Sequence, residues 1–168
     1  MNDISEADIA YRQYAHEVQC LLIDYQFIEE GLRMYIGHVY NIIRVRADVD
    51  VAFKYSYRDT EKDALGKLIV KFEKLSNRDD LVKELKDLVS FRNKIAHEAF
   101  LHTVEQQEDI KYLDEQTDTF RALRERTKLV VAAINKEVGR IEKISKTHNK
   151  EAQKGQPGQS ASEQLDGN

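Results

Sequence analysis

The sequence has little of the residues that interrupt regular secondary structure. It holds one proline and seven glycines among 168 residues, and the proline and three of the glycines lie after residue 154. Proline and glycine punctuate turns, so their scarcity argues against a fold of many short strands. We therefore expect an all-α protein in which long helices occupy most of one domain.

Cysteine is nearly absent as well, because Cys20 is the only one. A single cysteine excludes a disulfide framework within the chain and a cysteine-rich zinc site. Cys20 adjoins two leucines, so burial as a small apolar residue is the simpler interpretation, with a reactive thiol as the alternative. The histidines show no metal-binding pattern, since His97 and His102 are five residues apart and an HExxH motif is missing. A glycine-rich phosphate loop and a GxSxG motif are also missing, so we predict neither a metal nor a cofactor.

Long apolar runs and a strong excess of one charge are also lacking. No stretch of about 18 apolar residues occurs, and the polar N-terminus shows no signal-peptide pattern, so we expect a cytoplasmic protein without membrane contact. The net charge is −4, which argues against non-specific binding of duplex nucleic acid as the main function. Residues 54–98 depart from this balance, with 11 basic and 9 acidic side chains. A local site for an anion is therefore compatible with that stretch.

Apolar residues recur at alternating steps of three and four along residues 11–42. This pattern predicts a long first helix, with Asp3 or Ser5 as its N-cap. Two long helices flanking two shorter ones predict an antiparallel bundle of four main helices. Their long apolar stripes also predict self-association of the chain. The other three helices are expected over residues 59–76, after a turn at 76–80, and over 105–145.

Two stretches lack a helical period. In residues 47–58 valines and aromatics alternate with other residues, and a lone strand would have no partner. We expect an ordered loop whose aromatics pack on the bundle; the alternative is a platform on which bases stack, with Lys54 and Arg58 beside it. The end of the chain is polar and rich in Gly, Gln and Ser. We therefore assign residues 1–146 to the helical domain and 147–168 to a disordered polar tail.

One segment carries residue types suited to chemistry, Arg92-Asn93-Lys94-Ile95-Ala96-His97. Arginine offers a permanent charge and a planar fork matched to phosphate oxygens. Histidine exchanges protons near neutral pH, and asparagine can orient a phosphate or the imidazole. Together they suit metal-free cleavage of RNA, with His97 as general base or acid at a ribose 2′-hydroxyl and Arg92 stabilising charge on the phosphate.

The same residues also have a structural interpretation. Polar side chains near a helix end often bond only to backbone groups or to nearby acids such as Glu84 and Asp87. On an ideal helix Arg92 and His97 point roughly 140° apart, whereas Asn93 and His97 share a face. Exposure discriminates between the two interpretations. Arg92 and His97 pointing into one cleft would favour catalysis, and separate burial or pairing with acids would favour a structural role.

The segment resembles the RNxxxH form of the motif shared by HEPN-domain proteins. A long helix followed by shorter ones, with the motif near the end of the third, is also similar to that superfamily over roughly residues 5–145. The resemblance implies a homodimer in which two motifs line one cleft, an RNA substrate, and an antitoxin or a defence-system protein as partner. It assigns Arg92, Asn93 and His97 to the active site and Lys94 to substrate binding.

One departure from the family pattern concerns regulation. Members paired with nucleotidyltransferase antitoxins have the motif RxxxxHxY, and here Ala99 stands in the place of that tyrosine. The residues together with this resemblance therefore predict a metal-independent endoribonuclease, and the resemblance implies one of the toxin or phage-defence kind, without that antitoxin mechanism. The alternative is a non-catalytic helical interaction or regulatory module with the same fold. A DNA-binding repressor is a weaker candidate, because no helix-turn-helix pair with a basic recognition helix is evident.

Overall fold

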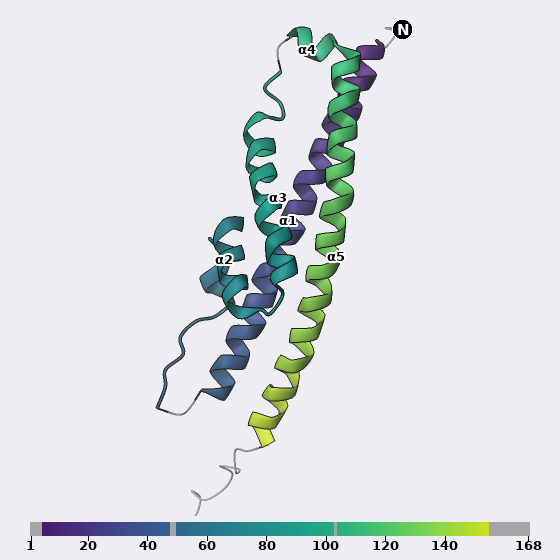
Figure 1. The fold of residues 1–168 in the computed structure, drawn as a ribbon. Helices are drawn as coiled ribbons and strands as arrows, with labels where there is room; N and C mark the ends of the chain where they lie inside the picture. The colour runs from purple at the N-terminus through teal and green to yellow at the C-terminus, as the bar shows by residue number, and fades with distance from the viewer. Residues whose placement is uncertain (1–4, 48–49, 103, 155–168) are drawn as a thin grey trace, which may run out of the picture.

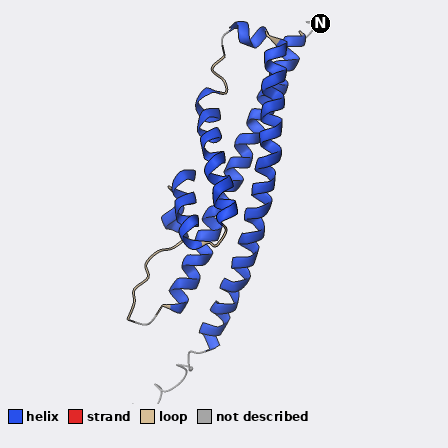
Figure 2. Cartoon of the chain, in the orientation of Figure 1, coloured by secondary structure: helices blue, strands red, loops and turns tan. Residues whose placement is uncertain are grey.

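The computed structural model describes residues 5–47, 50–102 and 104–154, and within these ranges every regular element is helical (Figures 1 and 2). Two long helices flank the shorter ones, so the prediction of an all-α helical bundle is confirmed. In chain order the elements are α1 (Glu6–Arg46), the 3₁₀ turn η1 (Tyr57–Thr60), α2 (Leu65–Leu75), α3 (Asp79–Glu98), α4 (Val104–Glu108) and α5 (Ile110–Lys154).

The start of α1 is set by a capping box. Ser5 accepts a hydrogen bond from the backbone N–H of Asp8, and the Asp8 carboxylate accepts one from the backbone N–H of Ser5. Two of the backbone donors that a helix start leaves unpaired are satisfied in this way. Ser5 is therefore the cap, as the sequence predicted, while the other candidate, Asp3, lies outside the described residues.

Contacts along the two long helices show that they run in the same direction (Figure 1). Near their N-terminal ends Tyr14 of α1 packs on Phe120 of α5, with ring centroids 5.5 Å apart. Near their C-terminal ends the amide of Asn41 donates to the hydroxyl of Ser145 at 2.9 Å. The two helices are therefore parallel to each other.

α3 runs antiparallel to both long helices. The Tyr25 hydroxyl of α1 donates to the carbonyl of Leu88 at 3.1 Å, and the Tyr14 hydroxyl, further back along α1, donates to the carbonyl of Ala99. The predicted antiparallel order thus holds for α3 with α5 and is wrong for the pair α1 and α5.

The segment between α1 and α2 explains this difference. After α1 the chain returns along that helix, because Phe53 packs on Tyr40 and Tyr57 lies against Gly37. Among its described residues this segment holds the short 3₁₀ turn η1 and no α-helix. A segment without an α-helix thus makes one of the return passes. The alternation expected of four successive helices is broken, and α5 takes the direction of α1.

The sequence predicted that the second helix begins near residue 60. In the structure α2 begins at Leu65. The guanidinium of Arg33 donates to the carbonyl oxygens of Thr60 and Asp63 at 3.3 and 3.2 Å. The Asp63 carboxylate pairs with Lys71 at 2.6 Å. Tertiary contacts from α1 therefore satisfy the backbone groups that an earlier helix start would have used.

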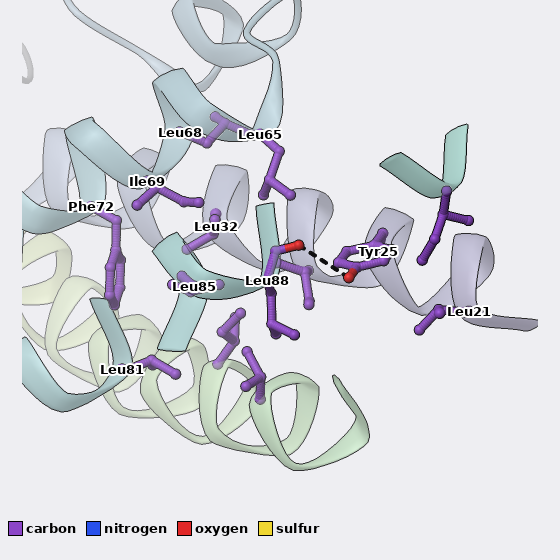
Figure 3. Packing of buried hydrophobic residues seen from close by; sticks show 14 of the residues in the cluster. Leu21, Tyr25, Leu32, Leu65, Leu68, Ile69, Phe72, Leu81, Leu85 and Leu88 are labelled. Atoms are coloured by element: carbon purple, nitrogen blue, oxygen red, sulfur yellow. Dashed lines mark hydrogen bonds between the residues drawn. The ribbon is translucent and has the colours of Figure 1, made fainter. Parts of the chain in front are cut away.

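The core lies where α2 and α3 cover α1 (Figure 3). Leucines of α3 meet Tyr25 and Leu32 of α1, and α5 closes the other side of α1. The two long helices approach closely at Gly31, where an added Cβ atom would lie 2.5 Å from Cγ2 of Ile134. The residues that Figure 3 labels on α2 and α3 are all buried: Leu65, Leu68, Ile69, Phe72, Leu81, Leu85 and Leu88.

The last predicted helix is divided and is longer than expected. Asp109 separates α4 from α5, because its carboxylate accepts a hydrogen bond from the backbone N–H of Tyr112 at 3.0 Å and so caps α5. α5 continues past the predicted domain boundary at 146, and Asn149 accepts a hydrogen bond from Asn41 of α1 at 3.1 Å. The assignment of the whole of 147–168 to a disordered tail is therefore wrong for residues 147–154, and residues 155–168 lie outside the described residues.

Candidate functional site

The motif lies on the C-terminal half of α3, as the sequence predicted. Its helix is held on both sides of the motif, by the hydrogen bond from Tyr25 to the carbonyl of Leu88 and by that from Tyr14 to the carbonyl of Ala99. Ile95 is buried between them, at 4% exposure. The motif side chains are thus carried by a helix whose position is defined by tertiary contacts.

The two tyrosines that hold this helix remain neutral donors. Burial raises the pKa of Tyr14 to about 12. Burial also raises the pKa of Tyr25 to about 12, although a hydrogen bond with Thr127 and the charges of Arg126 and Arg92 act in the opposite direction. Because a phenol donates only while it is protonated, both anchors persist through the physiological pH range.

Arg92 is half-buried and faces α1. Its Nη2 lies 3.6 Å from Oε1 of Glu29, and its Nη1 donates to Oδ1 of Asn93 at 3.5 Å. Glu29 also pairs with Arg33 at 3.3 Å. The guanidinium of Arg92 therefore belongs to a small charge network between α3 and α1, and its charge is partly compensated.

Asn93, Lys94 and His97 are exposed. Among the described residues, no hydrogen bond or ion pair joins Arg92 to His97. Their five-residue offset turns the two side chains roughly 140° apart on the helix. One chain therefore brings Arg92 beside Asn93 and does not bring Arg92 and His97 into one cleft.

The acids that the sequence offered as partners for Arg92 have a different partner. Glu84 and Asp87 of α3 pair with Arg126 of α5 at 2.8 and 3.2 Å. The hydrogen bond that Arg126 donates to Glu84, with smaller contributions that include Asp87, raises the pKa of Arg126 against the opposing effect of burial. These two acids therefore link α3 to α5, and the acid that pairs with Arg92 is Glu29 of α1.

A groove that sequence reasoning missed lies next to the motif. It has a volume of about 780 Å³ and is formed by the end of α3, the connection to α4, and α5. Lys94 and Ile95 are the motif residues that line it, together with Phe91 and Glu98 of the same helix. The spacing of three, four and seven residues from Phe91 to Glu98 marks one helix face, and that pattern was a signal available in the sequence.

His102 forms part of the wall of this groove. Its ring meets the rings of Tyr14 and Tyr112 edge-on, with centroids 4.9 and 5.7 Å apart. Its Nε2 atom is buried and has no hydrogen-bond partner among the described residues. Buried polar atoms are generally hydrogen-bonded, so this nitrogen is an unused polar group beside the groove.

The aromatic segment at 47–58 packs on the bundle, which confirms the prediction for its described residues. Phe53 and Tyr55 both contact Tyr40, with ring centroids 5.7 and 5.6 Å apart. The Tyr57 hydroxyl donates to Glu30 at 2.8 Å. The alternative prediction, a base-stacking platform beside Lys54 and Arg58, stays a prediction.

Comparison with known proteins found no relative of this chain. No family model matches the sequence, and neither a curated protein nor a solved structure matches it. Within the described ranges, no group of three or more His, Cys, Asp or Glu side chains could hold a metal ion. None of the helices in the described part of the chain is both long and apolar enough to cross a bilayer.

Proposed function

We propose that this protein is a metal-independent endoribonuclease of HEPN type that acts as a homodimer. The observation that carries the proposal is the placement of its polar motif. Exposed Asn93 and His97, with half-buried Arg92, project from a helix that tertiary contacts hold in place. A site whose supporting helix is rigid can hold its reactive groups in a defined geometry.

The residues suit an internal transfer at phosphorus. His97 takes the proton of a ribose 2′-hydroxyl, and the 2′-oxygen attacks the adjacent phosphorus. A bond from phosphorus to the 2′-oxygen forms, the bond to the leaving 5′-oxygen breaks, and that oxygen takes up a proton. Arg92 stabilises the charge on the phosphate oxygens, Asn93 orients the phosphate, and Lys94 binds the substrate backbone. The products are a 2′,3′-cyclic phosphate and a free 5′-hydroxyl.

A second copy of the chain would complete the site. Arg92 and His97 point in different directions from one helix. In the proposed dimer, Arg92 of one chain and His97 of the other chain therefore act on the same phosphate of the RNA. Directly after α3 the chain exposes large apolar side chains, Phe100 at 47%, Leu101 at 76% and Val104 at 70%. Exposed apolar side chains that gather next to a polar motif are typical of protein interfaces. The resemblance to HEPN proteins adds a toxin or phage-defence role and a neutralising partner to the proposal, and the sequence pattern adds a cytoplasmic location.

RNA cleavage in the presence of a chelator tests this proposal. Replacing His97 with alanine should slow cleavage by about 10²–10⁴-fold, the usual contribution of a general acid or base. His16→Ala is the matched control, because His16 is also an exposed histidine on a helix, far from the motif in sequence. Full activity in His97→Ala would remove His97 from the mechanism, and no cleavage by folded wild-type protein would reject the nuclease.

A non-catalytic helical interaction module is the second candidate, and the pairing of Arg92 with Glu29 favours it. In that case Arg92 serves to hold α3 on α1. Removing an ion pair that is partly exposed costs about 1 kcal/mol or less. Arg92→Lys distinguishes the candidates, because lysine keeps a charge near Glu29 and loses the planar fork. A loss of cleavage at unchanged thermal stability supports the nuclease, whereas lowered stability in Arg92→Ala that Arg92→Lys restores, without cleavage in any variant, supports the module.

A further inference from the structure

The groove beside the motif is not used by the proposed chemistry. Its volume of about 780 Å³ lies within the range of about 300–1,000 Å³ that is common for small-molecule sites. Three helices supply aromatic rings to its walls, Tyr14 from α1, Phe91 from α3, and Tyr112 and Phe120 from α5. Phe91 is 44% exposed, so part of its ring is available to a ligand. Rings on the walls suit a flat, unsaturated ligand.

Two charged side chains of α3 stand at the same groove. Lys94 and Glu98 lie one helical turn apart, both are exposed, and neither takes part in an ion pair within the described part of the chain. Arg126 also lines the groove, but its charge is compensated by two acids of α3. Lys94 therefore offers a cation to a phosphate, and Glu98 offers a carboxylate that accepts hydrogen bonds from amino groups.

The inner wall of the groove adds a polar atom. Nε2 of His102 is buried and has no hydrogen-bond partner within the described ranges, and the ring lies against Tyr14 and Tyr112. A ligand that combines a flat ring with hydrogen-bonding groups at its edge would match this wall better than a purely aliphatic ligand would. Nucleobases have this combination of a ring face and a polar edge.

We propose that the groove binds one unpaired base of an RNA strand. The proposal rests on the proposed nuclease function and adds a subsite for a single base to it. A base inside a duplex is stacked on both faces and paired at its edge, so it cannot enter the groove. The aromatic walls stack on the base, and Lys94 binds the phosphate of the same nucleotide.

The position of the groove fits the proposed cleavage chemistry. Lys94 and His97 are three residues apart on α3, and residues at that spacing are neighbours on a helix surface, with Cβ atoms about 5–6 Å apart. Lys94 lines the groove, whereas His97 does not. A strand with a base in the groove would therefore run from Lys94 toward His97 and bring a neighbouring phosphate to the exposed Asn93 and His97.

The carboxylate at the groove implies a preference among bases. Adenine and cytosine carry an exocyclic amino group that can donate to Glu98, and uracil does not. We therefore expect oligoadenylate and oligocytidylate to bind more tightly than oligouridylate. Glu98→Ala should remove this preference, because the variant loses the acceptor while the aromatic walls remain.

Binding can be measured separately from cleavage with 2′-O-methyl oligonucleotides, which lack the attacking hydroxyl. In fluorescence anisotropy the wild type should bind single-stranded 2′-O-methyl oligoadenylate at least about tenfold more tightly than the same strand in a duplex, since stacking one base is worth about 1–3 kcal/mol. Ala122→Phe should weaken single-strand binding by about tenfold, because exposed Ala122 lines the groove and the larger ring would fill it. Ala132→Phe is the control, since Ala132 is an exposed alanine of α5 that does not line the groove.

The outcomes separate the groove from the nuclease. Equal binding by the wild type and Ala122→Phe, equal affinity for single strand and duplex, or tightest binding of oligouridylate would each overturn the groove proposal. If Ala122→Phe fails to fold, the Glu98→Ala comparison decides in its place. Binding that follows the expected pattern without any cleavage of unmodified RNA keeps the groove and rejects the nuclease. Cleavage that Ala122→Phe does not affect keeps the nuclease and rejects the groove.

Discussion

The two halves of α3 differ in what covers them. In the first half Leu81, Leu85 and Leu88 are at most 3% exposed, and they belong to the buried hydrophobic core (Figure 3). In the second half Ile95 is the large apolar residue that is buried, while Phe91 is 44% exposed. The motif and the groove both lie on the second half. A single helix thus combines a half that stabilises the fold with a half that presents side chains to a ligand.

Ion pairs follow the same division, apart from the pair of Arg92 on the second half with Glu29 of α1. The first half of α3 is linked to its neighbours by Lys86 with Glu73 of α2 and by two acids with Arg126 of α5. On the second half Lys94 and Glu98 have no such partner among the described residues. Side chains that stabilise the fold are already paired, and those left without a partner are the ones available for binding. This difference places the candidate function on the half of α3 with less packing.

The largest expected effect is the difference in stability between truncating a buried leucine in the first half of α3 and truncating an exposed leucine just after its second half. Leu88→Ala should lower the free energy of unfolding by about 2–5 kcal/mol, because Leu88 is buried and the deletion leaves a cavity. Leu101→Ala removes the same atoms from a side chain that is 76% exposed and should change stability by about 0.5 kcal/mol or less. Urea unfolding of both variants measures the difference. Similar losses in the two variants would mean that the C-terminal end of α3 and its connection are as well packed as the core.

A glycine pair tests the contact between the parallel long helices. Gly31→Ala should destabilise the protein by about 1–3 kcal/mol, because the added Cβ would meet Ile134 at 2.5 Å in a packed core. Gly66→Ala on α2 is the control, since its Cβ would meet nothing within 4 Å. There alanine should stabilise the helix by about 0.5–1 kcal/mol. Thermal unfolding would contradict the close approach of α1 and α5 if both variants gained stability.

The smallest expected effect is a pH dependence at the start of α3. The Arg78 guanidinium donates to both carboxylate oxygens of Asp80 and lowers the pKa of Asp80 to about 2. Because the pKa of Asp80 is lowered in the folded state, its carboxylate contributes to stability at pH values above its unfolded pKa of about 3.9. This contribution is lost as the pH falls toward 2. The stability difference between wild type and Arg78→Ala should therefore shrink over that range. NMR titration of the Asp80 carboxyl group checks the cause, and an ordinary pKa in the wild type would contradict it.

Much of the fold was predictable from the sequence because the signals of a helix, its apolar period and its capping residues, lie within the helix itself. The apolar period of residues 11–42 predicted α1, and Ser5 was one of the two residues predicted to cap its start. The position of the motif near the end of the third main helix also followed from the sequence. The candidate site was predicted as a set of residues on one helix, with the angular offset between Arg92 and His97 already evident.

Other features depended on contacts between residues far apart in the chain. The late start of α2 depends on Arg33, which lies on another helix. The groove depends on α5 lying beside the end of α3, and no local pattern states that α5 runs parallel to α1. The break between α4 and α5 has a local signal, the N-cap Asp109. Sequence reasoning missed it because the apolar pattern continues through that position.

The sequence by itself determined that this protein is helical, where its two long helices lie, and which six residues carry a chemical signature, because side-chain periodicity and capping act within a few residues of the backbone. Only the tertiary structure decided which of those six face α1, the groove or solvent. That choice depends on which helix packs beside α3. Arg92 faces α1, Lys94 lines the groove and His97 stays exposed because α1 and α5 cover the other faces of α3.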